Sequence, residues 1–158
     1  YDLADQIGRV LASYRLSPDS LLLEITETGV MLDPDQVVEM LDELSNMGLK
    51  LSIDDFGTGH SSLAYLKRLP VHTLKVDKSF VTDMDADEDN ASIVLATIDL
   101  AHSLGLEVTA EGVETRPVYE MLWEMGCDCY QGYYVSEPLE MGAISDWLDN
   151  GRMARQVN

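Results

Sequence analysis

The sequence lacks long hydrophobic runs and has few cysteines. No apolar stretch approaches the roughly 18–20 residues that a membrane-spanning helix needs, and nothing resembles a signal peptide. The only cysteines, Cys127 and Cys129, are too close in sequence for a useful disulfide framework, so we expect free thiols in a reducing compartment. We therefore expect a cytoplasmic domain that does not insert into a membrane, with any membrane anchoring of a parent protein supplied by other domains.

Basic residues are also scarce, with 10 Lys and Arg against 29 Asp and Glu and a formal net charge of −19. This surplus of negative charge argues against broad electrostatic binding to nucleic acid polymers or to an anionic membrane. One acidic run is expected to be a solvated loop: Asp83, Asp85, Asp87, Glu88 and Asp89. The informative carboxylates are therefore those in apolar surroundings.

The chain has enough apolar residues for one hydrophobic core, since 46% of its 158 residues are hydrophobic. Five apolar runs, expected to be strands, begin near residues 21, 49, 71, 106 and 129, and the last extends to 135. Helical patterns lie around them, within 2–15, 33–48, 63–69, 93–105, 117–125 and beyond 140. Asp33 and Pro34 are expected to begin the second helix, and Met121, Leu122 and Trp123 to pack within the fifth.

This alternation is typical of a parallel α/β sheet, and the absence of any linker indicates one domain, 1–158. An open doubly wound sheet is the alternative to a (β/α) barrel. However, no glycine-rich phosphate loop of the Rossmann or P-loop type follows any strand.

Every expected strand ends in a polar or acidic group. These groups are Glu24 with Glu27, Asp54 with Asp55, Lys75 with Asp77, Glu111 with Glu114, and Gln131. In a (β/α) barrel the carboxyl ends of all strands gather at one face, so the groups would converge. A single acid in such a place is usually a helix N-cap, an interpretation that suits Glu27 taken alone. Capping does not account for acids at the ends of four strands.

Several carboxylates held together repel one another unless a cation balances them. The ligand set is rich in oxygen and lacks Cys and His at zinc spacing, which favours Mg²⁺ or Mn²⁺. The neighbours Asp54 and Asp55 suit a pair of ions roughly 3.5–4 Å apart that share a bridging carboxylate. Lys75 and Asp77 are two positions apart and so point to the same side of a strand. The lysine could hold an attacking water or a phosphate oxygen.

Five motifs in order resemble the EAL domain family of cyclic-di-GMP phosphodiesterases. They are Leu23-Glu24-Ile25-Thr26-Glu27, Ile53-Asp54-Asp55-Phe56-Gly57-Thr58-Gly59-His60-Ser61-Ser62-Leu63, Leu74-Lys75-Val76-Asp77, Ala110-Glu111-Gly112-Val113-Glu114 and Gln131-Gly132-Tyr133. Each motif alone is weakly specific, but their order and spacing together are highly specific. The resemblance covers essentially the whole chain.

The resemblance implies a modified TIM barrel that hydrolyses cyclic-di-GMP to linear pGpG with two Mg²⁺ or Mn²⁺ ions. It implies that Glu24 and Asp54 bind one ion and that Asp54, Asp55 and Glu111 bind the other. By the same resemblance, Lys75 would orient the nucleophilic water and contact substrate, with Asp77 and Gln131 supporting the water and metal shell. Glu114 would steady the loop Asp55–Ser62, which the family also uses in dimer contact.

Three departures from the family pattern stand out. A (β/α)₈ barrel takes about 250 residues, whereas this chain has 158 and about five strand–helix units. It therefore resembles the C-terminal two-thirds of the domain. By this resemblance, the Glu-Ala-Leu strand and a metal-binding asparagine are missing. His60 replaces a frequent tyrosine, which we interpret as loop variation, and Glu137 replaces a frequent basic residue. Tyr133 and Tyr134 are expected either to stack on guanine or to pack in the core.

Two alternatives follow from the departures. A parent domain that has lost upstream ligands would be a catalytically degenerate cyclic-di-GMP receptor or an interaction module. The 158-residue chain by itself is expected to be weakly active or inactive and to self-associate, because two sheet edges are open.

Overall fold

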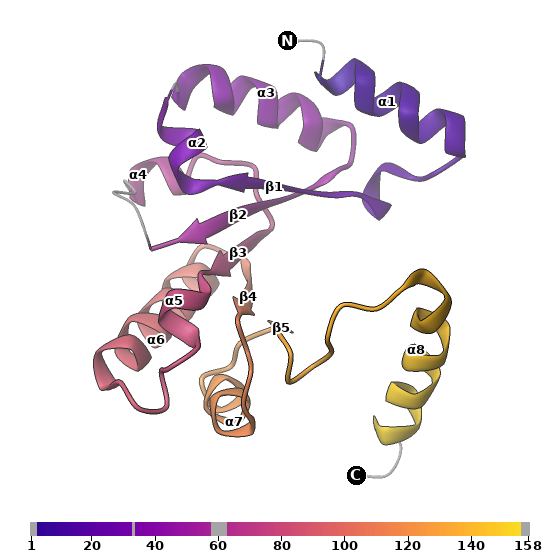
Figure 1. Ribbon diagram of the computed structural model, residues 1–158. Coiled ribbons are helices and arrows are strands. Elements are labelled where there is room, and N and C mark those ends of the chain that lie inside the picture. Colours follow the sequence, from indigo (N-terminus) through magenta and orange to yellow (C-terminus); the bar gives the residue numbers. More distant parts are fainter. Residues whose placement is uncertain (1–2, 33, 58–62, 156–158) are drawn as a thin grey trace.

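The computed structural model describes residues 3–32, 34–57 and 63–155 and contains one parallel sheet. Its strand order follows the sequence: β1 (Leu22–Thr26), β2 (Lys50–Phe56), β3 (Thr73–Val76), β4 (Glu107–Glu111) and β5 (Cys129–Gln131) (Figure 1). β1 and β5 are not paired with each other in this order, so the described sheet has two edges. The predicted parallel α/β alternation is confirmed.

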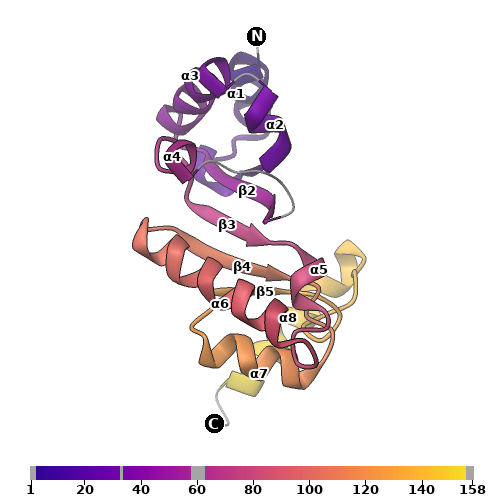
Figure 2. The ribbon, with the colours of Figure 1, turned by 90° about the vertical axis from the view of Figure 1, so that its left-hand side faces the viewer.

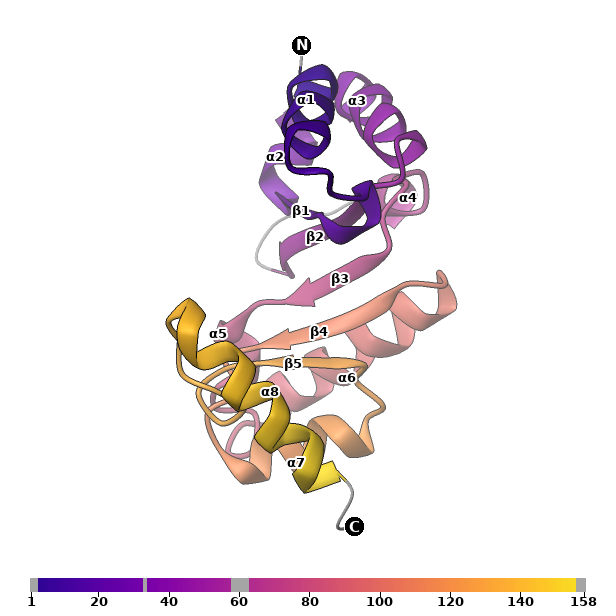
Figure 3. The ribbon, with the colours of Figure 1, turned by 90° about the vertical axis from the view of Figure 1, so that its right-hand side faces the viewer.

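Helices precede, connect and follow the strands. They are α1 (Leu3–Tyr14), the 3₁₀ turn η1 (Pro18–Ser20), α2 (Glu27–Leu32), α3 (Pro34–Asn46), α4 (Leu63–Leu66), α5 (Lys78–Val81), α6 (Glu88–Ser103), α7 (Arg116–Glu124) and α8 (Met141–Arg155). Figures 2 and 3 show α3 beside β1 and β2, and α6 and α7 beside β4 and β5. No helix of the described residues is long and apolar enough to cross a membrane.

The two faces of the sheet differ in chemistry. In-register neighbours in a parallel sheet share a face, so Ile25, Ile53, Leu74 and Val108 lie together on one side. This side forms the core with apolar residues of the helices, including Val94, Ile98 and Leu122, which are fully buried. The opposite side is polar and carries Glu24, Ser52, Thr73 and Glu107 in one row. Helices therefore cover the apolar face, and the polar face is left to form a site.

Some boundaries differ from those predicted. α2 and α5 were not predicted, because they are short and follow strands directly. The last strand ends at Gln131 rather than 135, where Gly132 approaches the backbone of Val113 so closely that a Cβ would lie 2.3 Å from its oxygen. α3 begins at Pro34 as predicted, while Asp33 lies outside the described residues.

The acidic run between β3 and α6 is exposed, as expected for a solvated segment. Its residues have a local structural role as well. Asp87 is the N-cap of α6, and its carboxylate accepts hydrogen bonds from the backbone N–H groups of Asp89 and Asn90. Glu88 and Asp89 belong to the first helical turn rather than to the loop.

Candidate metal and catalytic site

A buried lysine lies at the centre of the predicted polar cluster. The Nζ of Lys75 on β3 is 2.8 Å from Glu24 Oε1 on β1, 3.2 Å from Asp54 Oδ1 on β2 and 2.6 Å from Glu111 Oε1 on β4. Its side chain is only 6% exposed. Four neighbouring strands therefore bring these four predicted site residues together at their carboxyl ends.

The charges within this cluster are only partly balanced. Burial lowers the pKa of Lys75, but hydrogen bonds to Glu111, Glu24 and Asp54 outweigh it, and the net effect raises the pKa above that of a free lysine. The side chain is therefore an ammonium ion at neutral pH and a hydrogen-bond donor. One ammonium against three carboxylates leaves an excess of negative charge, which a divalent cation would offset.

Asp54, Asp55 and Glu111 have the geometry of a hard-metal ligand set. Each offers one carboxylate oxygen, and these oxygens lie within 4.8 Å of one another, each side chain being half-buried. Oxygens at the ~2.0–2.6 Å metal distances of Mg²⁺, Mn²⁺ or Ca²⁺ can have such separations around one ion. The residues present thus fit a divalent ion of the kind that the sequence predicts.

A bulge in β2 allows Asp54 and Asp55 to serve one site. Adjacent residues of a regular strand face opposite sides of a sheet, but the pairing of β2 with β3 shifts between Ile53 and Phe56. Asp55 has a φ of 56°, which aspartate tolerates better than most residues. Its backbone N–H donates to Asp54 Oδ1 at 3.1 Å. The irregular backbone thereby directs both carboxylates to the same place.

Asp77 and Gln131 lie near the site but differ in their contacts. Asp77 is the N-cap of α5, and its carboxylate accepts hydrogen bonds from the Ser79 backbone N–H at 3.0 Å and from the Ser79 hydroxyl. Burial raises the pKa of Asp77, but these bonds outweigh it and lower the pKa overall. Gln131 is exposed and in register with Glu111, so the two share the polar face. Their supporting roles stay predictions.

Glu27 has a role that the sequence did not suggest. Its side chain is buried, and Oε2 accepts a hydrogen bond at 3.0 Å from the backbone N–H of Gly57, directly after β2. The capping interpretation of Glu27 is wrong, because the Thr26 hydroxyl is the group that accepts from the Gly29 N–H. Glu27 thus fixes the start of the loop that follows the two aspartates. No local sequence signal marks this contact, because the two residues are thirty positions apart.

The rest of that loop, residues 58–62 with His60, lies outside the described residues. Glu114 is exposed, and its predicted loop-stabilising role stays a prediction. Tyr133 and Tyr134 are both exposed, and the Tyr134 ring packs against Tyr119 of α7 at 5.3 Å between centroids.

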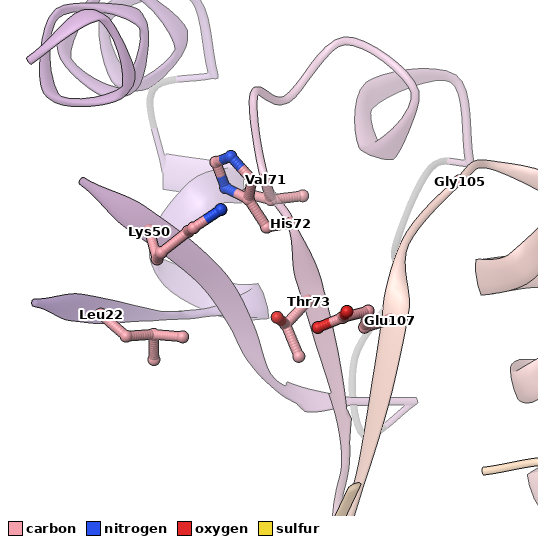
Figure 4. Close-up of a pocket in the computed structure, with 7 residues that line it drawn as sticks. All are labelled: Leu22, Lys50, Val71, His72, Thr73, Gly105 and Glu107. Atoms are coloured by element: carbon pink, nitrogen blue, oxygen red, sulfur yellow. The ribbon is translucent and has the colours of Figure 1, made fainter. Parts of the chain in front are cut away.

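A hollow lies at the amino ends of the strands, away from the Lys75 cluster. It has a volume of about 330 Å³ and is lined by Leu22, Lys50, Val71, His72, Thr73, Gly105 and Glu107 (Figure 4). The chemistry of (β/α) barrels is found at the carboxyl ends of the strands, whereas residues at the amino ends serve stability. We therefore place the functional site at the Lys75 cluster.

Comparison with known proteins identifies the fold and the motifs. The EAL domain profile matches residues 2–138. The chain belongs to the EAL domain family. Among its relatives in Pseudomonas aeruginosa, the bifunctional diguanylate cyclase/cyclic di-GMP phosphodiesterase MucR is 44% identical over 137 residues, 87% of this chain and 20% of MucR. The cyclic di-GMP phosphodiesterase NbdA of the same organism is 44% identical over 146 residues, 92% of this chain and 19% of NbdA.

Solved EAL domain structures agree with this assignment. The MucR phosphodiesterase in complex with c-di-GMP superimposes with a TM-score of 0.88 at 43% identity, over 90% of this chain and 58% of that one. The EAL domain of DcpA from Mycobacterium smegmatis gives 0.88 at 38% identity, over 95% and 67%. EAL domains are TIM-like barrels, so the open sheet is part of such a barrel. The chain spans about a fifth of the length of these curated relatives.

Proposed function

We propose that this EAL chain forms the metal-binding part of a phosphodiesterase that hydrolyses cyclic-di-GMP to linear pGpG in bacterial second-messenger signalling. The observation that carries the proposal is the convergence of Glu24, Asp54 and Glu111 on Lys75, with a carboxylate oxygen of Asp55 within 4.8 Å of those of Asp54 and Glu111. The relatives MucR and NbdA are named as phosphodiesterases of this nucleotide. We further propose a cytoplasmic location and a homodimer.

In this proposal the carboxylates hold two Mg²⁺ or Mn²⁺ ions. When bound, such ions polarise the phosphate and lower the pKa of a water molecule. Glu24 and Asp54 would be ligands of one ion, and Asp54, Asp55 and Glu111 of the other. Charge masking is essential here, because both the protein, at −19, and a phosphodiester are negative.

The remaining residues would position the reactants. Protonated Lys75 has three N–H donors and no acceptor, and here it contacts three carboxylates. It would exchange one of these contacts to orient the attacking water or a phosphate oxygen, and it would not remove a proton. Its contacts with carboxylates from three other strands hold the ammonium in a defined place, as positioning requires. Gln131, on the same face beside Glu111, would contact substrate, and Asp77 would support the water shell.

The decisive experiment measures pGpG formation by a longer chain that contains the whole EAL domain, with cyclic-di-GMP and Mn²⁺ supplied. Asp54→Ala should lower the rate by at least about 100-fold, since even residues that only support metal ligands contribute about 10–100-fold. Asp99→Ala, at an exposed position of α6, is the matched control and should retain the rate. Binding of the nucleotide without turnover would contradict the proposed phosphodiesterase activity and favour the receptor alternative.

A further inference from the structure

The outer surface of α7 carries an exposed tryptophan between two acids. Trp123 is 67% exposed, so the expectation that it packs in the interior is wrong, whereas its neighbour Leu122 is fully buried. Trp123, Tyr119, Glu120 and Glu124, all on α7, line a shallow and open groove of about 530 Å³. None of these residues belongs to the cluster around Lys75.

The aromatic side of this groove is supported by two further tyrosines that pack against Tyr119. The ring of Tyr119 lies 4.8 Å from that of Tyr130 and 5.3 Å from that of Tyr134, centroid to centroid. Tyr130 is fixed in turn, because its hydroxyl donates to the Cys127 carbonyl at 2.8 Å. The groove therefore presents a supported ring beside an exposed one.

The acidic wall is negative and only partly compensated. Glu120 accepts a hydrogen bond from Arg116 Nε at 2.7 Å across one helical turn, and both side chains are exposed. Glu124 forms no ion pair with any described residue. The chain as a whole has a charge of −19, so its long-range field also attracts cations.

We propose that this groove, the α7 groove, binds an arginine-bearing segment of another protein. A guanidinium stacks on an indole or phenol face and also forms paired hydrogen bonds with a carboxylate, so it matches both walls at once. A neutral apolar segment would leave Glu124 without compensation, and an anionic one would be repelled. The groove thus has the chemistry of a docking site for a basic partner.

This site is separate from the catalytic end of the domain. α7 begins after the carboxyl end of β4 and runs back to the start of β5, so Trp123 near its last turn lies at the end of the sheet away from Lys75. A partner could therefore dock while the cluster stays accessible.

The test measures the affinity of the full chain for a short peptide of alternating arginine and glycine. Binding is followed by calorimetry and by Trp123 fluorescence in a Trp147→Phe background. Trp123→Ala should weaken binding about fivefold or more, and Glu120→Gln with Glu124→Gln should weaken it further. A peptide with glutamine in place of arginine should not bind.

A matched pair on another helix controls for general charge attraction. Glu39 and Glu43 are exposed and also four residues apart on α3, which contains no aromatic residue. Glu39→Gln with Glu43→Gln should leave the affinity unchanged, and an equal loss in both double variants would overturn the proposal. Trp123→Leu keeps apolar volume without an aromatic face, so unaltered binding by this variant would also overturn it. Circular dichroism confirms that each variant is folded.

Discussion

Lys75 is a buried cation whose neighbours are the acids that would hold the metal. Its ammonium partly neutralises Glu24, Asp54 and Glu111. The cluster is therefore ordered by its own ion pairs, and a divalent ion would compete with the lysine for the same oxygens.

Removing this cation should destabilise the metal-free protein. We expect Lys75→Met to lower the free energy of unfolding by about 2 kcal/mol in EDTA, less than the ~3–5 kcal/mol of a fully buried pair because the acids are partly exposed. Added Mn²⁺ should then raise the melting temperature of the variant more than that of the wild type. Lys67→Met, at an exposed position, is the control, and equal melting temperatures in EDTA would contradict this account.

Glu27 and Glu114 provide a second comparison at this scale. Glu27→Ala removes the acceptor of the Gly57 N–H from a buried position and should cost about 2 kcal/mol in urea unfolding. Glu114→Ala, at an exposed position, should change the free energy of unfolding by less than about 0.5 kcal/mol. A larger loss for Glu114→Ala would instead give that residue the loop-stabilising role.

The sequence predicts the acids that gather around Lys75, but not the hydrogen-bond partners of Glu27 and Asp77. Acids that end apolar strands can be expected to converge, as Glu24, Asp54 and Glu111 do, because parallel strands share one carboxyl edge. The partner of Glu27 is a backbone N–H thirty positions away, and no local pattern marks it. Asp77 is likewise evident in the sequence as an acid after a strand, but its bonds to Ser79 as the N-cap of α5 are not.

At the scale of elements, the junctions between strands and helices decide the shape of the site. Long periodic segments such as α6 and α3 are evident in the sequence, whereas the four-residue α5 has too few residues to show a period. The bulge of β2 is also hidden, because nothing in Asp54-Asp55 specifies a shift in pairing. Tertiary contacts, not local propensity, determine these features.

Gly112 illustrates such a junction and can be tested. Gly112 and Gly105 have similar φ values of 71° and 77°, but a Cβ at Gly112 would lie 2.6 Å from Lys78 Cβ, whereas one at Gly105 would have nothing within 4 Å. Both substitutions to alanine incur left-handed strain of about 1 kcal/mol. Gly112→Ala should cost about 1–3 kcal/mol more, because it also displaces α5 from the end of β4. Equal melting temperatures for the two variants would show that α5 moves freely.

At the scale of the whole molecule, the described sheet leaves polar backbone groups at two edges, β1 and β5. Leu22 on the β1 edge is 44% exposed. The helix α8 lies apart from the other helices (Figure 1) and exposes Ile144, Trp147 and Leu148. These surfaces favour association.

We expect the 158-residue chain alone to self-associate as its concentration rises and to have little hydrolytic activity. Size-exclusion chromatography with light scattering measures this directly. Leu22→Lys should reduce the association, because a charge on an edge strand opposes pairing. Leu16→Lys, at an exposed position before β1, should not. A monomer at every concentration with full activity would contradict the expectation.

The order of the charges along the chain has a consequence for synthesis. Two of the acids that contact Lys75 precede it and the third, Glu111, follows it. A ribosome adds about 5–20 residues per second, so Lys75 is added within seconds of Asp54 and before Glu111. The growing polypeptide therefore contains a cationic partner for Glu24 and Asp54 before the third acid is added, and that partner is part of the chain itself.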